Sequence, residues 1–251
     1  MKIVSVINLK GGVGKSATTI NKAHILATKY KKRVLIVDDD KQGNTSKFLK
    51  LHGYDMETIS NILLERNYDT HKAIYHTQYP NLDLISANMD LLKANLQIIM
   101  DPSRQQQTIL SKALKQVEDE YDYCIIDNAP DINISVINGL VAADDVIVPI
   151  KIDQFSFDGL EQLTEQFETI RDFNPKLNFR GCLITQYVKN DVNEQGECYL
   201  GQTNYPVFAT HIRRTEKVDE STFARVPIVE YSRRCGAAKD YLDFVKEYLG
   251  E

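Results

Sequence analysis

Short, continuous apolar runs alternate along this chain with longer segments in which apolar residues recur every three or four positions. The continuous runs predict β-strands that are covered on both faces, and the longer segments predict amphipathic helices. Their alternation predicts an α/β fold with a doubly wound, mostly parallel sheet and helices on both faces. The predicted strands are residues 3–7, 34–37, 82–86, 123–127, 146–150 and 179–185, with a short strand near 207–211.

Helical periodicity is clearest in five segments, which are residues 16–28, 89–100, 105–118, 160–171 and 237–249. The last of these has an apolar face that we expect to pack on the sheet. Residues 189–204 are polar and include Gly196 and Gly201, so they predict a mobile surface loop. The apolar face of the last helix consists of Ala237, Tyr241, Phe244, Val245 and Tyr248.

Length and composition are compatible with a single domain covering residues 1–251. The chain is 43% hydrophobic and can bury a full core. No apolar run approaches the ~18 residues of a membrane span, so we expect a cytoplasmic protein without a membrane partner. The four cysteines form no CxxC pair, and Cys124 and Cys182 lie in apolar runs where a small buried thiol is the usual explanation.

The chemistry begins directly after the first predicted strand, in the segment NLKGGVGKSATT at residues 8–19. Its glycines allow a tight turn that brings backbone N–H groups against phosphate oxygens, and the next helix offers an N-terminus that favours an anion. Lys15 places a charge near the terminal phosphates, and the Ser16 hydroxyl is positioned to coordinate Mg²⁺. The segment therefore predicts a triphosphate site.

This loop departs from the standard phosphate loop, which has glycine where Leu9 stands, and it carries an additional lysine, Lys10. The pattern KGGVGKS resembles the deviant Walker A motif of the ParA/MinD class of P-loop ATPases, in particular the small, Soj-like ParA partition ATPases. The resemblance implies that Lys10 reaches across an ATP-sandwich dimer to the partner's phosphates. It implies catalytic roles for Lys10 and Lys15 and a cofactor site formed by Lys10, Gly11, Gly12, Val13, Gly14, Lys15, Ser16, Ala17 and Pro149.

Carboxylates stand at the ends of two predicted strands, at the sheet edge where doubly wound folds bind ligands. Asp38, Asp39 and Asp40 follow the strand at 34–37, and Asp127 ends the strand at 123–127. The resemblance implies that Asp40 positions or activates the attacking water. It also implies that Ser16, Asp38 and Asp127 organise Mg²⁺ and its waters. We expect Asp39 to face solvent or a neighbouring lysine.

The resemblance extends over nearly the whole chain, through residues 33–46, 121–131, 144–160 and 213–231. The block at 144–160 is similar to the strand and loop near the adenine base, which is why Pro149 joins the cofactor set. Three positions depart from the family pattern. Lys41 replaces a proline, and we expect this to loosen the segment after the strand at 34–37. Ala17 lacks a hydroxyl that commonly contacts the α-phosphate in the family. Asn128 begins an unusual segment after the Walker B aspartate.

Charge gives weaker support for nucleic-acid binding. The formal net charge of −5 excludes a uniformly basic surface, but DNA needs only a local basic patch. The last third of the chain is rich in arginine, and ParA relatives use arginines of this region for a sequence-independent DNA surface. Paired charges on a solvated helix face are the alternative. The candidate DNA-binding residues are Arg213, Arg214, Arg233 and Arg234.

The resemblance implies an ATP-dependent DNA partition ATPase with ATP and Mg²⁺ as cofactors. It would form a homodimer with ATP, bind nonspecific double-stranded DNA on the nucleoid, and hydrolyse ATP slowly until a ParB-like centromere-binding adaptor stimulates it. The first alternative is a MinD-like membrane-associated ATPase, for which a basic amphipathic tail after the last helix is expected and is not seen in this sequence. The second is a metabolic or electron-transfer P-loop enzyme, which would need a substrate pocket or paired cluster cysteines.

Overall fold

The computed structural model describes the backbone of residues 1–251 and every side chain except that of Phe155. Its strands form one sheet in the order β3-β4-β2-β5-β1-β6-β7-β8. Only the edge strand β3 runs antiparallel to its neighbour, so the prediction of a mostly parallel sheet is confirmed. The strands are β1 Lys2–Val6, β2 Val34–Asp39, β3 Ile74–His76, β4 Leu82–Ile85, β5 Tyr123–Asn128, β6 Asp145–Ile150, β7 Asn178–Tyr187 and β8 Ile212–Arg213.

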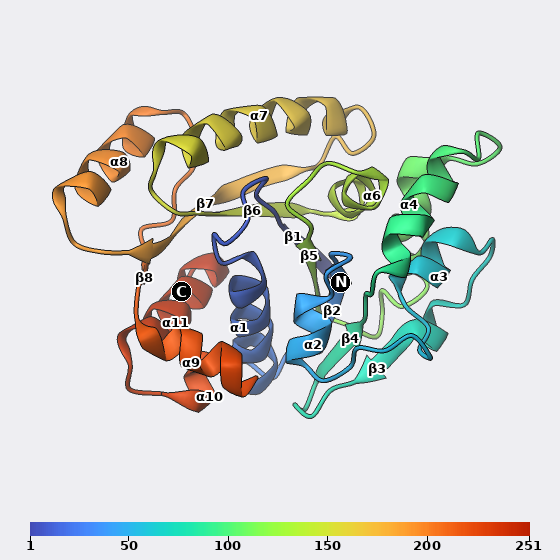
Figure 1. The fold of residues 1–251 in the computed structure, drawn as a ribbon, viewed down its shortest axis with the longest axis horizontal. Helices are drawn as coiled ribbons and strands as arrows, with labels where there is room; N and C mark the ends of the chain where they lie inside the picture. The colour runs from blue at the N-terminus through green and yellow to red at the C-terminus, as the bar shows by residue number, and fades with distance from the viewer.

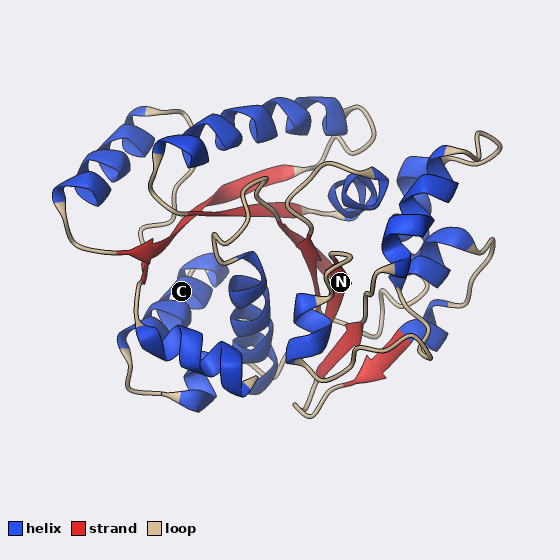
Figure 2. Ribbon diagram, in the orientation of Figure 1, coloured by secondary structure: helices blue, strands red, loops and turns tan.

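Helices cover both faces of this sheet (Figures 1 and 2). Helices α1, α9, α10 and α11 gather on one side, and α6 and α7 lie on the other. The helices are α1 Lys15–Thr28, α2 Asn44–Phe48, α3 Ile59–Leu64, α4 Asp90–Ile99, α5 Ile109–Lys115, α6 Ile134–Ala142, α7 Gln154–Arg171, α8 Asp191–Gln202, α9 Glu216–Ala224, α10 Ile228–Tyr231 and α11 Gly236–Leu249, with short 3₁₀ turns η1 Thr70–Ala73 and η2 Gln106–Thr108.

Strand β1 occupies the middle of the sheet, between β5 and β6. The carboxyl ends of these central strands meet at one edge, and the loop from β1 to α1 starts there. Helix α11 packs beside α1, and the predicted apolar face of α11 is buried in the core as expected. The sheet thus holds the residues that follow β1, β2 and β5 close together.

Three local predictions differ from the structure. Residues 189–204 contain helix α8 instead of a mobile loop, because Asn190 caps the helix and Leu200 anchors it in the core. Gly196 is needed there, since an added Cβ would lie 2.2 Å from the Ile152 side chain. The short strand predicted near 207–211 is reduced to a single parallel β-bridge between Val207 and Cys182 of β7, and β8 follows it in the chain. The predicted helix at 105–118 is divided into η2 and α5. None of the helices that the structure describes is both long and apolar enough to cross a membrane.

Candidate active site

The loop between β1 and α1 has the backbone conformation of a phosphate-binding turn. Gly12 and Gly14 have φ angles of 73° and 85°, a region that other residues rarely adopt. Helix α1 begins at Lys15 without a side-chain cap, so no cap side chain satisfies its first N–H groups. Free helix N-terminal donors and their dipole favour an anion. The loop therefore fits a phosphate group.

Two residues that the sequence analysis missed hold this loop in place. The Thr185 hydroxyl donates a hydrogen bond of 2.8 Å to the Val13 carbonyl. The Gln186 side-chain amide donates one of 2.5 Å to the Gly12 carbonyl. Both residues lie in β7, and the only sequence signal for them was their position at the carboxyl end of a predicted strand. Val13 is buried, whereas Gly11 and Gly12 before it are exposed.

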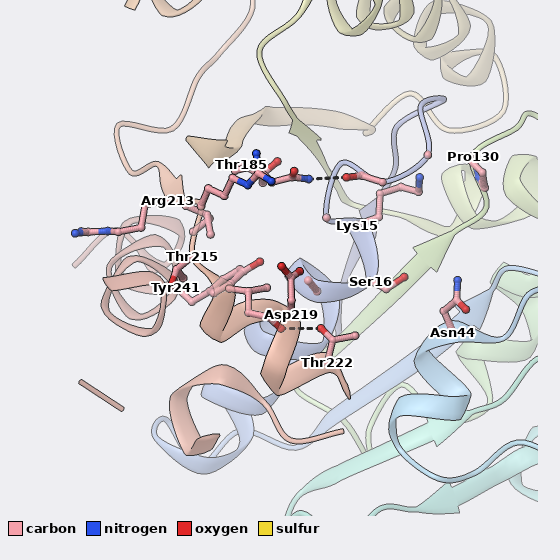
Figure 3. Close-up of a pocket in the computed structure, with 18 of the residues that line it drawn as sticks. Lys15, Ser16, Asn44, Pro130, Thr185, Arg213, Thr215, Asp219, Thr222 and Tyr241 are labelled. Carbon is pink, nitrogen blue, oxygen red and sulfur yellow. Dashed lines mark hydrogen bonds between the residues drawn. The ribbon is translucent and has the colours of Figure 1, made fainter. Parts of the chain in front are cut away.

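A cavity of about 610 Å³ opens in front of the loop, within the size range of small-molecule sites (Figure 3). The phosphate-loop glycines, Lys15 and Ser16 form its base. Asp40 and Pro130 line it from the ends of β2 and β5, and the segment from β8 to α9 closes the other side. The remaining lining residues are Ala17, Gln42, Asn44, Thr185, Gln186, Ile212, Arg213, Arg214, Thr215, Val218, Asp219, Thr222 and Tyr241.

The two lysines of the loop have different surroundings. Lys15 lines the cavity, and its ammonium donates a 3.0 Å hydrogen bond to the Lys10 carbonyl. Burial lowers the pKa of Lys15, and the charges of Asp127 and Asp40 oppose that shift. Lys10 is not among the cavity-lining residues, and its ammonium forms a 2.5 Å ion pair with Asp153, the N-cap of α7.

Asp38 and Asp127 face each other in register on neighbouring strands and are both buried. Ser46 donates its backbone N–H and its hydroxyl to Asp38, at 2.8 and 2.7 Å. The Thr45 hydroxyl donates to Asp127 at 2.7 Å. Burial raises the pKa of both carboxyls, and the charge of Asp127 raises that of Asp38 further. Two buried carboxylates that repel each other are a natural site for a nearby cation.

These donors fit Mg²⁺ better than a metal held by protein ligands alone. Among the residues that the structure describes, no cluster of three His, Cys, Asp or Glu side chains could hold a metal. Mg²⁺ usually keeps several waters and takes one or two protein ligands together with phosphate oxygens. The Ser16 hydroxyl at the cavity base, with Asp38 and Asp127 behind it, matches that mode of binding.

The three consecutive aspartates point to different sides, because successive side chains of an extended chain alternate between the two faces of a sheet. Asp40 lines the cavity, and its Oδ1 accepts a 2.9 Å hydrogen bond from the Gln42 N–H. Asp39 is fully buried, so the expectation that it faces solvent or a lysine was wrong. Strand β2 continues to Asp39, which turns this side chain away from Asp38 and toward Gly139 of α6. Burial raises the pKa of Asp39 well above its usual value.

The positions that depart from the family pattern have defined contacts. Lys41 pairs with Asp131 at 3.5 Å and so joins the segment after β2 to the segment after β5 instead of leaving it loose. Asn128 donates to the Ser5 hydroxyl and the Val6 carbonyl, which ties β5 to β1.

Pro149, which the sequence analysis placed in the cofactor site, is buried within β6 and is not among the cavity-lining residues. Its carbonyl accepts a hydrogen bond from Asn8.

The four candidate arginines fall into two places. Arg213 and Arg214 line the cavity, whereas Arg233 and Arg234 are exposed between α10 and α11. The Arg213 guanidinium forms hydrogen bonds of 2.7 and 2.6 Å to Asp240, and in Figure 3 it points away from Lys15. Arg213 therefore has a structural contact that the sequence analysis did not foresee.

Comparison with known proteins agrees with this geometry. A family described as an AAA domain matches residues 1–179. The chain is 33% identical to the sporulation initiation inhibitor protein Soj of Bacillus subtilis, over 98% of this chain and 97% of Soj. It is 30% identical to the chromosome partitioning protein ParA of Caulobacter vibrioides, over 99% of this chain and 94% of that protein.

A solved structure of cobyrinic acid a,c-diamide synthase from Mycobacterium smegmatis, with bound ATP analog and magnesium, superposes with a TM-score of 0.87. It is 27% identical and covers 99% of this chain and 94% of that one. The loop with two lysines, the paired carboxylates at the ends of β2 and β5, and the full-length similarity to Soj and ParA lead to the same assignment. This chain belongs to the ParA/MinD-type family of deviant Walker A P-loop ATPases.

Proposed function

We propose that this protein is a DNA partition ATPase that uses ATP and Mg²⁺. ATP closes a sandwich dimer, the dimer binds nonspecific double-stranded DNA on the nucleoid, and a ParB-like centromere-binding adaptor stimulates hydrolysis and releases it. The full-length relatives named Soj and ParA support this proposal over other activities of the family.

The placement of Lys10 is the observation that carries the proposal. Lys15 already supplies the cation at the base of the cavity, and Lys10 lies outside the cavity lining. The ammonium of Lys10 is partly exposed beside the phosphate loop, where Asp153 holds it at 2.5 Å. A cation that borders a phosphate site without lining it is well placed to serve the site of a second subunit.

The residues of the cavity have separate tasks in this proposal. The Gly12 and Gly14 turn and the α1 N-terminus bind the phosphates, and Lys15 neutralises their charge. Asp40 orients the attacking water, because it is the carboxylate of its segment that lines the cavity. Ser16, Asp38 and Asp127 would hold Mg²⁺ together with its waters, and the ion would offset the negative charge on the transferred phosphoryl group.

The exposed pair Arg233 and Arg234 is the proposed DNA contact. Both lie on the surface at the start of α11, and no ion pair to either is found in the described structure. Arg214 is also exposed but lines the cavity, and Arg213 is bound to Asp240. Phosphate contacts of this kind position a protein on DNA without reading its sequence.

The test is binding to a random-sequence DNA duplex, measured by fluorescence anisotropy with ATP and with ADP at several salt concentrations. We expect binding only with ATP. Replacing Arg233 and Arg234 with alanine should weaken it and reduce the slope of log affinity against log salt by about 0.9 for each lost phosphate contact. The matched control replaces Lys112 and Lys115 of α5, which removes the same charge from the opposite face, and should bind normally.

Equal binding with ATP and ADP, or no binding, would contradict the partition proposal. Sedimentation with anionic liposomes in ATP provides the companion measurement. ATP-dependent liposome binding without DNA binding would favour the MinD-like membrane function instead.

A further inference from the structure

A cavity of about 410 Å³ lies between α3 and the segment formed by η2 and α5, and it shares no lining residue with the active-site cavity. Helix α3 lies beside α4 at the right of Figure 1, whereas α1 and the phosphate loop lie left of the centre. The volume is within the range of small-molecule sites. Ile62, Ile109 and Ala113 form the apolar part of the lining, and Ile62 and Ala113 are buried in the core. The cavity therefore offers a firm apolar surface to a ligand.

The charge of this cavity is positive, although the chain as a whole carries a formal net charge of −5. Three of the four charged residues that line it are basic, namely Arg66, Arg104 and Lys112, and the fourth is Glu65. Arg66 is paired at 3.2 Å with Asp101, which is not among the lining residues. A concave site with an excess of cations attracts anions, so the lining predicts an anionic ligand.

Structural contacts account for only part of the hydrogen-bonding capacity of Arg104 and Lys112. Arg104 Nη1 donates a 2.9 Å hydrogen bond to the carbonyl of Leu64, the last residue of α3. The Lys112 ammonium donates one of 3.2 Å to the Gln105 side chain, which is neutral. A guanidinium has five N–H donors and an ammonium has three, and no salt bridge to either residue is found in the described structure. Both cations can therefore bind an anion without giving up an acidic partner.

We propose that this cavity is a second ligand site, which binds a small organic molecule with two phosphate groups and an apolar or aromatic part. One phosphate lies between Arg104 and Lys112, and the other contacts Arg66. The apolar part of the ligand packs against Ile62 and Ile109. A guanidinium binds two oxygens of one phosphate at once, and a phosphate monoester carries more negative charge near neutral pH than a carboxylate does. Phosphates therefore fit this lining better than carboxylates.

One wall of this cavity is joined to the active site through α6. The side chain of Asn138 in α6 is fully buried, and its Oδ1 accepts a 2.8 Å hydrogen bond from the Ile109 N–H. Its Nδ2 donates one of 2.6 Å to the Gln106 carbonyl. Helix α6 begins at Ile134, shortly after Pro130, which lines the active-site cavity. A ligand that fixes η2 and α5 therefore also restrains the helix that follows this active-site segment.

The test is calorimetric titration of adenosine 3′,5′-bisphosphate into the full-length protein saturated with ADP and Mg²⁺, so that the phosphate loop is already occupied. We expect one further site, whose affinity falls with salt. Adenosine monophosphate and propane-1,2,3-tricarboxylate should bind about tenfold more weakly or less, because they lack the second phosphate or both. Lys112→Gln and Arg104→Gln should each reduce the affinity for the bisphosphate about tenfold or more, as expected for lost hydrogen bonds to a charged group.

The matched control, Lys115→Gln, removes the same charge from an exposed position of α5 outside the lining and should retain wild-type affinity. Lys112 is also exposed, so its replacement tests the contact without disturbing the core.

Amide hydrogen exchange locates the ligand. We expect the bisphosphate to slow exchange in residues 104–116 and in α6. No heat of binding at about 1 mM ligand, equal binding by wild type and Lys112→Gln, or slowing confined to residues 8–19 would overturn the proposal. Because binding is measured without DNA or hydrolysis, the result is independent of the partition proposal.

Discussion

Lys22 lies in the middle of α1, and its side chain is completely buried. Its ammonium nitrogen is 2.9 Å from the centroid of the Tyr248 ring and has no hydrogen-bond partner within the described structure. Burial lowers the pKa of Lys22 well below 10.5, although the charge of Asp145 opposes this. A lysine in this setting destabilises the fold, because the unfolded chain binds its proton more readily.

We therefore expect Lys22→Met to raise the free energy of unfolding at neutral pH by about 1–3 kcal/mol. The folded pKa lies below the unfolded value, so the wild type gains stability as pH rises between the two and the gain ends above 10.5. The free energy of unfolding of the methionine variant should not rise with pH in this way. Urea unfolding of both proteins across that range measures it. A Lys22→Met variant that is less stable than the wild type would show that the contact of Lys22 with the Tyr248 ring stabilises the fold by more than the burial of Lys22 destabilises it.

Asp40 offers a prediction about chemistry at the same scale. Its carboxylate lines the cavity and Gln42 orients it, so Asp40→Ala should slow single-turnover hydrolysis by about 10²–10⁴-fold. Nucleotide affinity should change little, because the phosphates are held by the loop and Lys15. The ATP dimer should then accumulate on DNA. Wild-type turnover in this variant would mean that another group positions the water.

The residues of the site could be predicted from the sequence to the extent that they follow strands. Asp38, Asp40 and Asp127 stand at strand ends, and the phosphate loop follows β1 directly. Asp39 could not be placed, because its burial depends on β2 continuing two residues beyond the apolar run. The ion pair between Lys10 and Asp153 joins segments that are distant in the sequence, and no local pattern encodes such a contact.

At the scale of elements, Arg213 links β8 to α11. Its guanidinium binds the buried Asp240 through two hydrogen bonds, and its side chain passes so close to Gly236 that a Cβ there would lie 2.3 Å from Arg213 Cδ. The glycine at the start of α11 thus makes room for this bridge. Arg213 and Arg233 are both candidate DNA-binding arginines, but Arg213 forms this ion pair and Arg233 is exposed.

Arg213→Ala should lower the free energy of unfolding by about 1–3 kcal/mol, because the buried Asp240 carboxylate loses its guanidinium partner and keeps the hydrogen bond from the backbone N–H of residue 213. Arg233→Ala, at an exposed position, should change stability by less than about 0.5 kcal/mol. Thermal unfolding of the two variants provides the comparison. Equal stability would indicate that water replaces the guanidinium. DNA-binding tests should therefore use Arg233 and Arg234 and avoid Arg213.

The main strands and the long helices were predictable because apolar periodicity alone determines them. The missed elements depend on other signals. Helix α7 begins at Gln154, ahead of the predicted start at residue 160, because the Asp153 cap starts it before its apolar periodicity becomes regular. Strand β3 is an edge strand of three residues, too short to show a pattern. Helix α8 is polar on most of its surface and is stabilised by its cap and by Leu200.

For the whole molecule, the proposed dimer depends on Lys10. Lys10→Ala should keep most of the nucleotide affinity of the monomer and lose ATP-dependent dimerisation, because the lost charge serves the neighbouring phosphate site. Light scattering in ATP measures the dimer fraction. Lys151→Ala, which removes another exposed lysine near α7, is the control and should dimerise normally. An unchanged dimer fraction in Lys10→Ala would exclude the sandwich arrangement.

The central position of β1 also determines the order in which the protein can assemble during synthesis. β1 and the phosphate loop are made before the strands that hold them, because β1 pairs with β5 and β6, and Thr185 and Gln186 of β7 donate hydrogen bonds to the loop. The first apolar run must therefore remain unpaired until about half of the chain has been made. A nascent chain that ends before β7 contains the whole phosphate-loop motif and still lacks the contacts that shape it. The contacts that shape the nucleotide site therefore form only after β7 has been made.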